Sequence, residues 1–312
     1  MPLQPTDGRP GTAVTPTTEP PLGHLYEVAP GRRLMLHRSG TGGPTVVFLP
    51  GAGLIGLDFL NTHDRVAELT TSVLYDRAGT GWSSPVGLPR TAADVVGELH
   101  GLLRTAAVPG PYVLVGHSLG GAYARHFAQR FPDEVAGLLL LDPFHEDIRD
   151  RAPREVREKL ALMTGQEEPP EPTREQLDTA RTQIAPLFAA WPDTVREPLV
   201  DYHLTAWRTA LREGRNVYDE VADELRHAPA LPDVPLIVLS ATGYDATQSQ
   251  LWSEETLREI NRGKCALHAQ LAASVPRGAH RVLDDAGHGF PHEERPDAVL
   301  QAITDLLARP GD

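Results

Sequence analysis

The turn Gly-His-Ser-Leu-Gly-Gly at residues 116–121 constrains the fold of this chain more than any other feature. The run before it, residues 112–115, has the composition of a buried strand, and a helical pattern follows it until Pro132. A serine on so sharp a strand-to-helix turn has unfavourable dihedral angles, and flanking glycines let the neighbouring backbone approach. In this context the pattern Gly-x-Ser-x-Gly predicts that Ser118 is a nucleophile.

Short β-rich runs alternate with helical patterns along the rest of the chain, which indicates βαβ units and a mostly parallel sheet. Strands are expected at residues 24–28, 34–38, 45–49, 72–75, 112–115, 135–141, 235–240 and 280–283, the first two as a hairpin. Thr91 and Asp94 form a capping pair before a helix with one apolar face, and residues 296–307 form a closing amphipathic helix. These elements predict an α/β fold with a doubly wound sheet of about eight strands.

The alternation stops at residues 144–230, which contain only helical stretches rich in Glu, Arg and Pro. We interpret them as a helical cap over the carboxyl edge of the sheet, inserted into a core of residues 23–143 and 231–312. Residues 1–22 are rich in Pro, Thr and Gly and have no hydrophobic stretch of the kind that signal peptides need. They predict a disordered leader on a cytoplasmic enzyme.

Charge and composition exclude several classes of function. The net charge of −13 argues against binding to nucleic acid or to an anionic membrane, because phosphates would be repelled. No run approaches the ~20 apolar residues that span a bilayer. The single cysteine, Cys265, excludes an internal disulfide and is interpreted as an ordinary helix residue. His145 has no second histidine at ligand spacing, so it is interpreted as a solvated residue at the entrance of the cap rather than a metal ligand. No metal or organic cofactor is implied by the predicted chemistry.

Thirteen histidines are candidates for the general base. The base must reach Ser118 at the carboxyl edge of the sheet, and His288 lies shortly after the last expected strand. His292 is the nearest alternative and is interpreted as a supporting loop residue, whereas His280 lies at the wrong end of its strand. The side chain of His117 should point away from the nucleophile, in a structural role. We therefore predict that His288 is the base.

Four segments in a fixed order resemble the α/β-hydrolase superfamily, particularly its cap-bearing esterase, lipase and peroxidase-like branch. They are Phe-Leu-Pro-Gly-Ala-Gly at 48–53, Tyr-Asp-Arg-Ala-Gly-Thr-Gly-Trp-Ser at 75–83, the serine turn, and Ala-Gly-His-Gly at 286–289 with Glu-Arg-Pro at 294–296. The turn places the Leu119 N–H at a helix start, where it would face an oxyanion. The resemblance implies Ala52 N–H as the second oxyanion donor. Relatives often carry His-Gly before it, and the Pro50-Gly51 of this chain leaves that backbone donor intact.

The acid that orients His288 has two candidates, each after a strand at the correct edge. Asp142 directly ends the run 135–141, in a rigid position. Asp245 follows the run 235–240 across a short loop, at the strand from which most of the superfamily takes its acid, while a minority branch uses the position of Asp142. We prefer Asp142 for its rigid support and keep Asp245 as the alternative.

The predicted chemistry is acyl transfer to water, with Ser118 attacking a carbonyl and His288 accepting its proton. Asp76 and Arg77 are expected to brace the loop at 79–81 rather than to touch substrate. A cofactor-free perhydrolase and a non-catalytic ligand-binding protein are the alternatives. The partner is a small molecule; ester, thioester, lactone and amide substrates stay open, as does the oligomeric state.

Overall fold

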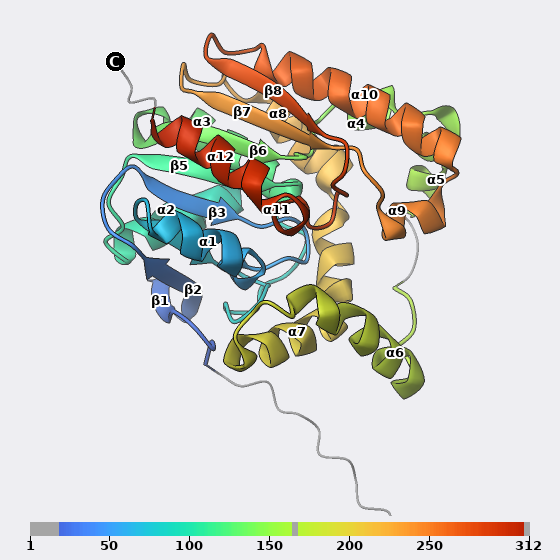
Figure 1. The fold of residues 1–312 in the computed structure, drawn as a ribbon, viewed down its shortest axis with the longest axis horizontal. Coiled ribbons are helices and arrows are strands. Elements are labelled where there is room, and N and C mark those ends of the chain that lie inside the picture. Colours follow the sequence, from blue (N-terminus) through green and yellow to red (C-terminus); the bar gives the residue numbers. More distant parts are fainter. Residues whose placement is uncertain (1–18, 164–167, 309–312) are drawn as a thin grey trace, which may run out of the picture.

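An eight-stranded sheet forms the centre of the computed structural model, which describes residues 19–163 and 168–308 (Figure 1). Its order is β1-β2-β4-β3-β5-β6-β7-β8. The strands are β1 (His24–Ala29), β2 (Arg32–Ser39), β3 (Thr45–Leu49), β4 (Ser72–Tyr75), β5 (Tyr112–His117), β6 (Val135–Leu141), β7 (Leu236–Ala241) and β8 (Gly278–Leu283). All eight expected strands are confirmed. Most of the predicted leader lies outside the described residues.

Six of the strands run parallel, and they decide where functional residues gather. β1 pairs antiparallel with β2 as a hairpin, and β2 pairs antiparallel with β4. β4, β3, β5, β6, β7 and β8 are parallel neighbours. Because carboxyl ends of parallel strands share one edge, the residues that follow β3, β5, β6 and β8 meet there. The chain order reverses between β3 and β5, the position at which such sheets form a binding crevice.

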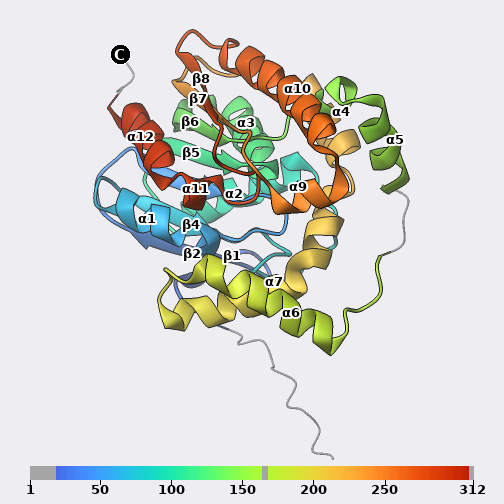
Figure 2. The ribbon, with the colours of Figure 1, turned by 45° about the vertical axis from the view of Figure 1, so that its right-hand side comes forward.

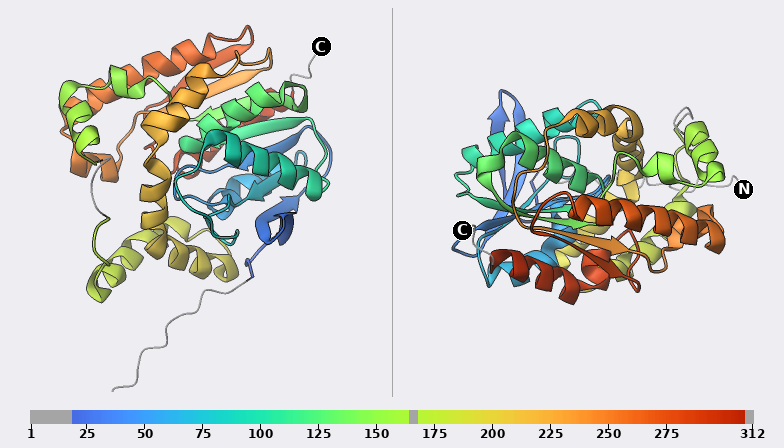
Figure 3. Two further views of the ribbon diagram at one scale, coloured as in Figure 1. Left: turned by 180° about the vertical axis from the view of Figure 1, so that it is seen from behind. Right: turned by 90° about the horizontal axis from the view of Figure 1, so that it is seen from above.

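Helices cover both faces of the sheet, each over its own buried apolar cluster. α2 (Ala92–Thr105) and α3 (Leu119–Arg130) pack on one face and lie in front of the sheet when it is seen from behind (Figure 3, left). α1 (Leu60–Ala67) and α12 (Pro296–Leu307) pack on the other face. The predicted cap of α2 is present, since the Thr91 hydroxyl accepts a hydrogen bond from Asp94 N at 3.0 Å. The pattern did not predict α1, because its buried face includes the polar residues Thr62 and His63.

Residues 144–230, called the helical segment below, connect β6 to β7 on the side toward which β3 points (Figure 1). Within the described part, the segment contains helices and no strand. They are α4 (Ile148–Arg151), α5 (Arg154–Met163), α6 (Arg174–Ile184), η3 (Ala185–Phe188), α7 (Asp193–Gly214), η4 (Val217–Val221) and α8 (Ala222–His227). α9 (Ala246–Leu251) and α10 (Glu254–Ala272) follow β7, and α11 (Pro291–Glu294) precedes α12. Figure 2 places α5 near α9, apart from the paired α6 and α7.

None of the helices in the described residues combines the length and the apolar character needed to cross a membrane.

Candidate active site

Ser118 occupies the turn between β5 and α3 in a strained conformation. Its φ of 50° and ψ of −119° lie in a region that a residue with a side chain rarely adopts. The glycines of the motif explain how the turn closes. A Cβ at Gly116 would lie 2.6 Å from the Gly120 carbonyl oxygen, and one at Gly120 would lie 2.0 Å from the Leu49 carbonyl oxygen. The turn therefore packs directly against the end of β3 and presents the Ser118 side chain at the sheet edge.

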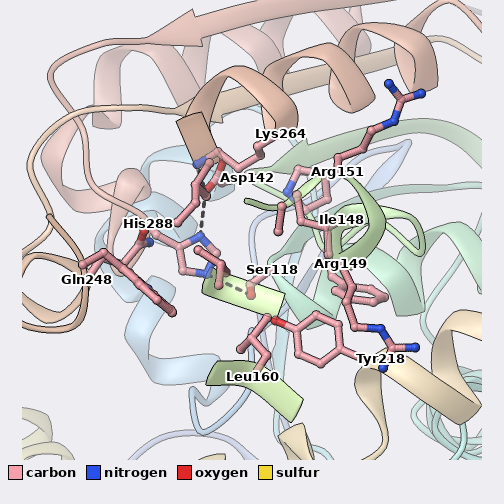
Figure 4. A pocket seen from close by; sticks show the side chains of 16 residues that line it. Ser118, Asp142, Ile148, Arg149, Arg151, Leu160, Tyr218, Gln248, Lys264 and His288 are labelled. Atoms are coloured by element: carbon pink, nitrogen blue, oxygen red, sulfur yellow. Dashed lines mark hydrogen bonds and ion pairs between the residues drawn. The ribbon is translucent and has the colours of Figure 1, made fainter. Parts of the chain in front are cut away.

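A continuous series of hydrogen bonds joins Ser118, His288 and Asp142. His288 Nε2 lies 3.1 Å from Ser118 Oγ, and its Nδ1 lies 2.6 Å from Asp142 Oδ2. A carboxylate only accepts, so Nδ1 carries the proton and Nε2 is free to accept from the Ser118 hydroxyl. Figure 4 shows the His288 ring between the other two side chains. The imidazole is thus held in the tautomer that can remove a proton from Ser118.

Asp142 is buried and held by three donors. Ala241 N donates to its Oδ1 at 3.1 Å, while Lys264 Nζ at 2.9 Å shares Oδ2 with His288. Burial opposes the negative charge, but the Lys264 ammonium and the His288 hydrogen bond outweigh it and hold the pKa of Asp142 well below its usual range. This carboxylate is therefore charged at neutral pH and fixed in orientation.

Asp245, the alternative acid, contacts the backbone of His288 and not its ring. Its Oδ2 accepts from His288 N at 3.1 Å, and its Oδ1 accepts from Gln248 N at 2.9 Å as the N-cap of α9. One oxygen thus holds the loop that carries His288, and the other caps α9. The structure brings Asp142 to the imidazole nitrogen and Asp245 to the adjacent peptide.

The other histidines considered from the sequence have structural contacts. His117 donates through Nε2 to the His288 carbonyl oxygen at 2.7 Å, and burial lowers its pKa well below its usual value. His292 stacks on Phe59 with ring centroids 3.9 Å apart. His280 bonds to Ser240 Oγ at 2.8 Å within the sheet.

The two predicted oxyanion donors lie on either side of Ser118. Leu119 is the first residue of α3, and Ala52 lies in the loop at residues 50–53, called the oxyanion loop below. A Cβ at Gly51 of this loop would lie 3.2 Å from Ser118 Cβ, so the loop runs beside Ser118. Among the described residues, neither the Ala52 nor the Leu119 N–H donates a hydrogen bond, and both stay available to a ligand.

Asp76 braces the loop at 79–81 with its side chain, whereas Arg77 does so only through its backbone carbonyl oxygen, which accepts from Thr80 N and Oγ1 at 3.0 Å each. Asp76 accepts from Trp82 N and Gly56 N at 2.9 Å each, and burial raises its pKa to about 7. The Arg77 side chain points instead to the oxyanion loop and to Glu213 of α7. Adjacent residues at the end of a strand send their side chains to opposite sides, which separates the two partners.

A cavity of about 250 Å³ opens at Ser118. The helical segment and α9–α10 supply its apolar walls: Phe144, Ile148, Val156, Leu160, Trp252 and Ile260. Tyr218 also lines it, with its hydroxyl directed toward Ser118 (Figure 4). A second cavity of about 740 Å³ shares the residues Gln248, Trp252, Lys264 and His288 with the first. Within the described residues, no group of three or more His, Cys, Asp or Glu could hold a metal ion.

Two residues of this site were not singled out from the sequence. Lys264 contacts Asp142 from 122 residues away, and Glu213 contacts Arg77 from 136 residues away. Each lies on a long helix among other charged residues, so its helical position alone gives no sign of a buried partner. Only a pattern of paired variation among related sequences could have connected them.

Comparison with known proteins gives this geometry a context. Residues 46–302 match the sequence profile of the alpha/beta hydrolase family. The chain is 41% identical over 108 residues to the pimeloyl-[acyl-carrier protein] methyl ester esterase of Chromobacterium violaceum, which covers 35% of this chain and 40% of that protein. It is 37% identical over 132 residues to Lipase LipV of Mycobacterium tuberculosis, covering 42% and 46% of the two. The chain spans less than half the length of the curated relatives it matches first.

A solved structure extends the likeness over the whole fold. The thermophilic esterase from Thermogutta terrifontis, with malate bound, superposes with a TM-score of 0.61 over 91% of this chain and 96% of that one. The identity is 23%, so this likeness concerns the fold alone. The expected fold is confirmed.

Proposed function

Since the chain belongs to the alpha/beta hydrolase family, we propose that it is a serine hydrolase that cleaves an ester-type bond of a hydrophobic small molecule. The observation that carries the proposal is the series of hydrogen bonds from Ser118 through His288 to Asp142. Such a series supplies a nucleophile, a base and an acid in the order that acyl transfer requires.

In the first half-reaction, Ser118 Oγ attacks the carbonyl carbon of the substrate while His288 Nε2 accepts the hydroxyl proton. The carbon becomes tetrahedral, and its oxygen becomes an oxyanion that accepts from the N–H groups of Ala52 and Leu119. The resulting imidazolium is stabilised by the charged Asp142. When the oxyanion collapses, the bond to the leaving group breaks, and His288 returns its proton to that group. An acyl-enzyme on Ser118 is left.

In the second half-reaction, His288 accepts a proton from water, and the hydroxyl oxygen adds to the acyl carbon. Collapse of this second tetrahedral species breaks the bond to Ser118 Oγ, which regains the proton from His288. The carboxylic acid leaves, and the enzyme is unchanged. Each oxyanion donor is expected to contribute about 3 kcal/mol to the lowering of the barrier.

The apolar walls of the cavity support an apolar acyl or alcohol group as the part of the substrate that is bound beside Ser118. We take the helical segment as the cap over this site, because its residues Phe144, Val156 and Leu160 form part of those walls. Ester hydrolysis by two of the curated relatives, as their names state it, is consistent with this substrate class.

Stopped-flow kinetics with 4-nitrophenyl esters test the proposal. The wild-type protein should release a burst of about one nitrophenolate per active site before a slower steady state. Ser118→Ala should show no burst and a kcat lower by about 10⁴-fold or more. A fluorophosphonate probe should modify Ser118, as peptide mass spectrometry would detect. Equal turnover by Ser118→Ala would refute the assignment, and a folded wild-type protein without adduct would favour a non-catalytic ligand-binding protein.

A further inference from the structure

Arg77 and Glu213 form a buried ion pair between the loop after β4 and the end of α7. Arg77 Nε donates to Glu213 Oε1 at 3.0 Å, and Nη2 donates to Oε2 at 3.1 Å. The two side chains are 1% and 4% exposed. The free energy needed to remove both charges from water offsets much of the free energy of their attraction, so such a pair adds little net stability. Its presence calls for another explanation, which the remaining contacts of the two side chains provide.

Apart from the Arg77 guanidinium over the Tyr123 ring, at 5.6 Å from its centroid, those contacts lie on the oxyanion loop. Arg77 Nη1 donates to the Pro50 carbonyl oxygen at 2.6 Å, and Nη2 donates to the Gly51 carbonyl oxygen at 2.8 Å. Glu213 Oε2 accepts from Gly53 N at 2.8 Å. The pair therefore holds the peptide groups before and after Ala52, the residue whose own N–H donates to no acceptor in the described part of the chain.

The helix that carries Glu213 also packs directly on this loop. Tyr202 donates through its hydroxyl to the Gly53 carbonyl oxygen at 3.1 Å. A Cβ at Gly53 would lie 2.5 Å from Ala210 Cβ, so helix and loop are in close contact. Tyr202, Ala210 and Glu213 recur at helical spacing and form one face of α7. This face therefore restricts the loop at Gly53, the residue that follows Ala52.

We propose that the Arg77–Glu213 pair is a positioning device, which fixes the oxyanion loop so that the Ala52 N–H faces the oxyanion. The inference rests on the proposed function. An oxyanion donor lowers the barrier only when it is oriented before charge develops, because reorientation during the reaction would consume the gain. α7 of the helical segment is therefore part of the catalytic framework, although none of its residues lines the cavity at Ser118.

The test replaces both partners, since a single replacement would leave a buried charge unpaired and endanger folding. Arg77→Met/Glu213→Met removes every contact of the pair with the loop and keeps similar side-chain volumes. The matched control is Arg125→Met/Glu146→Met. Arg125 and Glu146 form the same two-bond pair, at 2.6 and 2.8 Å, between α3 and the start of the helical segment. Among the described residues, neither of these side chains has a polar contact with the oxyanion loop.

With a 4-nitrophenyl ester, the Arg77→Met/Glu213→Met variant should lose about 100-fold in kcat, because a displaced donor acts mainly on the transition state. Its KM should stay within about threefold of wild type, since the substrate carbonyl binds with less charge than the oxyanion. A trifluoromethyl ketone that adds to Ser118 as a tetrahedral species should lose affinity in proportion to kcat/KM. The control pair should keep wild-type kcat. Circular dichroism and thermal unfolding establish that both variants fold.

Three outcomes would overturn the inference while wild type hydrolyses the ester: an unchanged kcat in the folded Arg77→Met/Glu213→Met variant, a loss confined to KM, or an equal loss in the control pair. If the folded Arg77→Met/Glu213→Met variant cannot be obtained, Glu213→Gln, which keeps an acceptor for Gly53 N, should show a smaller fall in kcat at unchanged KM. Wild-type kcat in that variant would also overturn the inference. A wild-type protein that forms no acyl-enzyme would instead refute the proposed function itself.

Discussion

Two helices of the helical segment, α7 and α5, meet the rest of the molecule in different ways. α7 is joined to the segments that follow β3 and β4 by polar contacts that are buried or partly buried: Glu213 to Arg77, Tyr202 to Gly53, and His203 to Asp58. α5 contributes the apolar side chains of Val156 and Leu160 to the cavity. Its charged side chains pair at the surface or contact α9 and α10, as Lys159 does through the Leu251 carbonyl oxygen.

This difference teaches that one insertion can do two separate tasks. Buried hydrogen bonds have defined directions and lengths, so α7 is suited to fixing the oxyanion loop. Apolar contacts are non-directional, so α5 can vary in shape and set how much space a substrate has without moving the catalytic groups. If this division is correct, changes at α7 should affect stability and rate, whereas changes at α5 should affect substrate preference.

The largest effect is expected from the contact between His203 and Asp58. His203 Nε2 lies 2.7 Å from Asp58 Oδ1, and the Asp58 side chain is fully buried. His203→Leu should lower the free energy of unfolding by about 3 kcal/mol, because it leaves Oδ1 of a buried carboxylate without a donor while Oδ2 keeps only Ile55 N. On α5, Arg154→Leu breaks the Arg154–Glu158 pair, whose side chains are 84% and 60% exposed.

That surface change should cost less than about 0.5 kcal/mol. Urea unfolding of both variants measures the two values side by side. Losses of similar size in His203→Leu and Arg154→Leu would show that α7 and α5 are held to the molecule equally strongly, which would contradict the difference drawn between them.

A smaller effect, dependent on pH, is expected at His292, which contacts Asp58, the partner of His203 on α7. His292 stacks on Phe59 and bonds through Nε2 to the Asp58 carbonyl oxygen at 3.1 Å. Burial lowers its pKa to about 4, against about 6.5 in an unfolded chain. As the pH falls, the folded state therefore binds a proton at His292 only at a lower pH than the unfolded state does. The stability contribution is fully present above pH 6.5 and is lost as pH falls from about 6.5 toward 4.

His292→Phe should remove this dependence. Between pH 8 and pH 5, wild type should lose about 2 kcal/mol more stability than the variant. Unfolding by urea at the two pH values measures the difference between them, so that the cost of the substitution itself cancels. Equal losses in the two proteins would contradict the assignment of a neutral, buried His292.

The smallest effect is expected at α5, in substrate preference. Val156 lines the cavity, whereas Val195 of α7 is equally buried but lies outside it. Val156→Ala should shift the ratio of kcat/KM between long-chain and short-chain esters by about tenfold in favour of the long chains. Val195→Ala should leave that ratio unchanged and lower stability by about 1 kcal/mol. A shift in the ratio with Val195→Ala, and none with Val156→Ala, would reverse the roles given to the two helices.

The sequence predicted those parts of the molecule that local pattern controls. Each buried strand is a short apolar run, and the serine turn needs glycines that are visible in the chain itself. The prediction was incomplete where a side chain could reach either of two partners. Arg77 was expected at its neighbouring loop, yet its guanidinium binds the oxyanion loop and Glu213. Periodicity gives the buried face of a helix but not the residue opposite it, which is why Lys264 was missed.

The acid of the site shows the same limit. Asp142 and Asp245 both follow strands at the carboxyl edge, and the pattern of residues is equally compatible with either. What separates them is direction, since Asp142 Oδ2 lies 2.6 Å from His288 Nδ1 while Asp245 Oδ2 accepts from the His288 backbone. Side-chain direction at the end of a strand depends on backbone angles such as the φ of 40° at Asp142, which sequence reading does not supply.

The most direct test of the catalytic account is the kcat/KM of Asp142→Asn and Asp245→Asn, measured on one ester. Asp142→Asn should lower it by about 10⁴-fold, because the amide no longer holds the His288 tautomer or stabilises the imidazolium. Asp245→Asn should lower it by less than about tenfold, since its amide oxygen can still accept from His288 N. A collapse of activity in Asp245→Asn, together with activity retained in Asp142→Asn, would contradict the account.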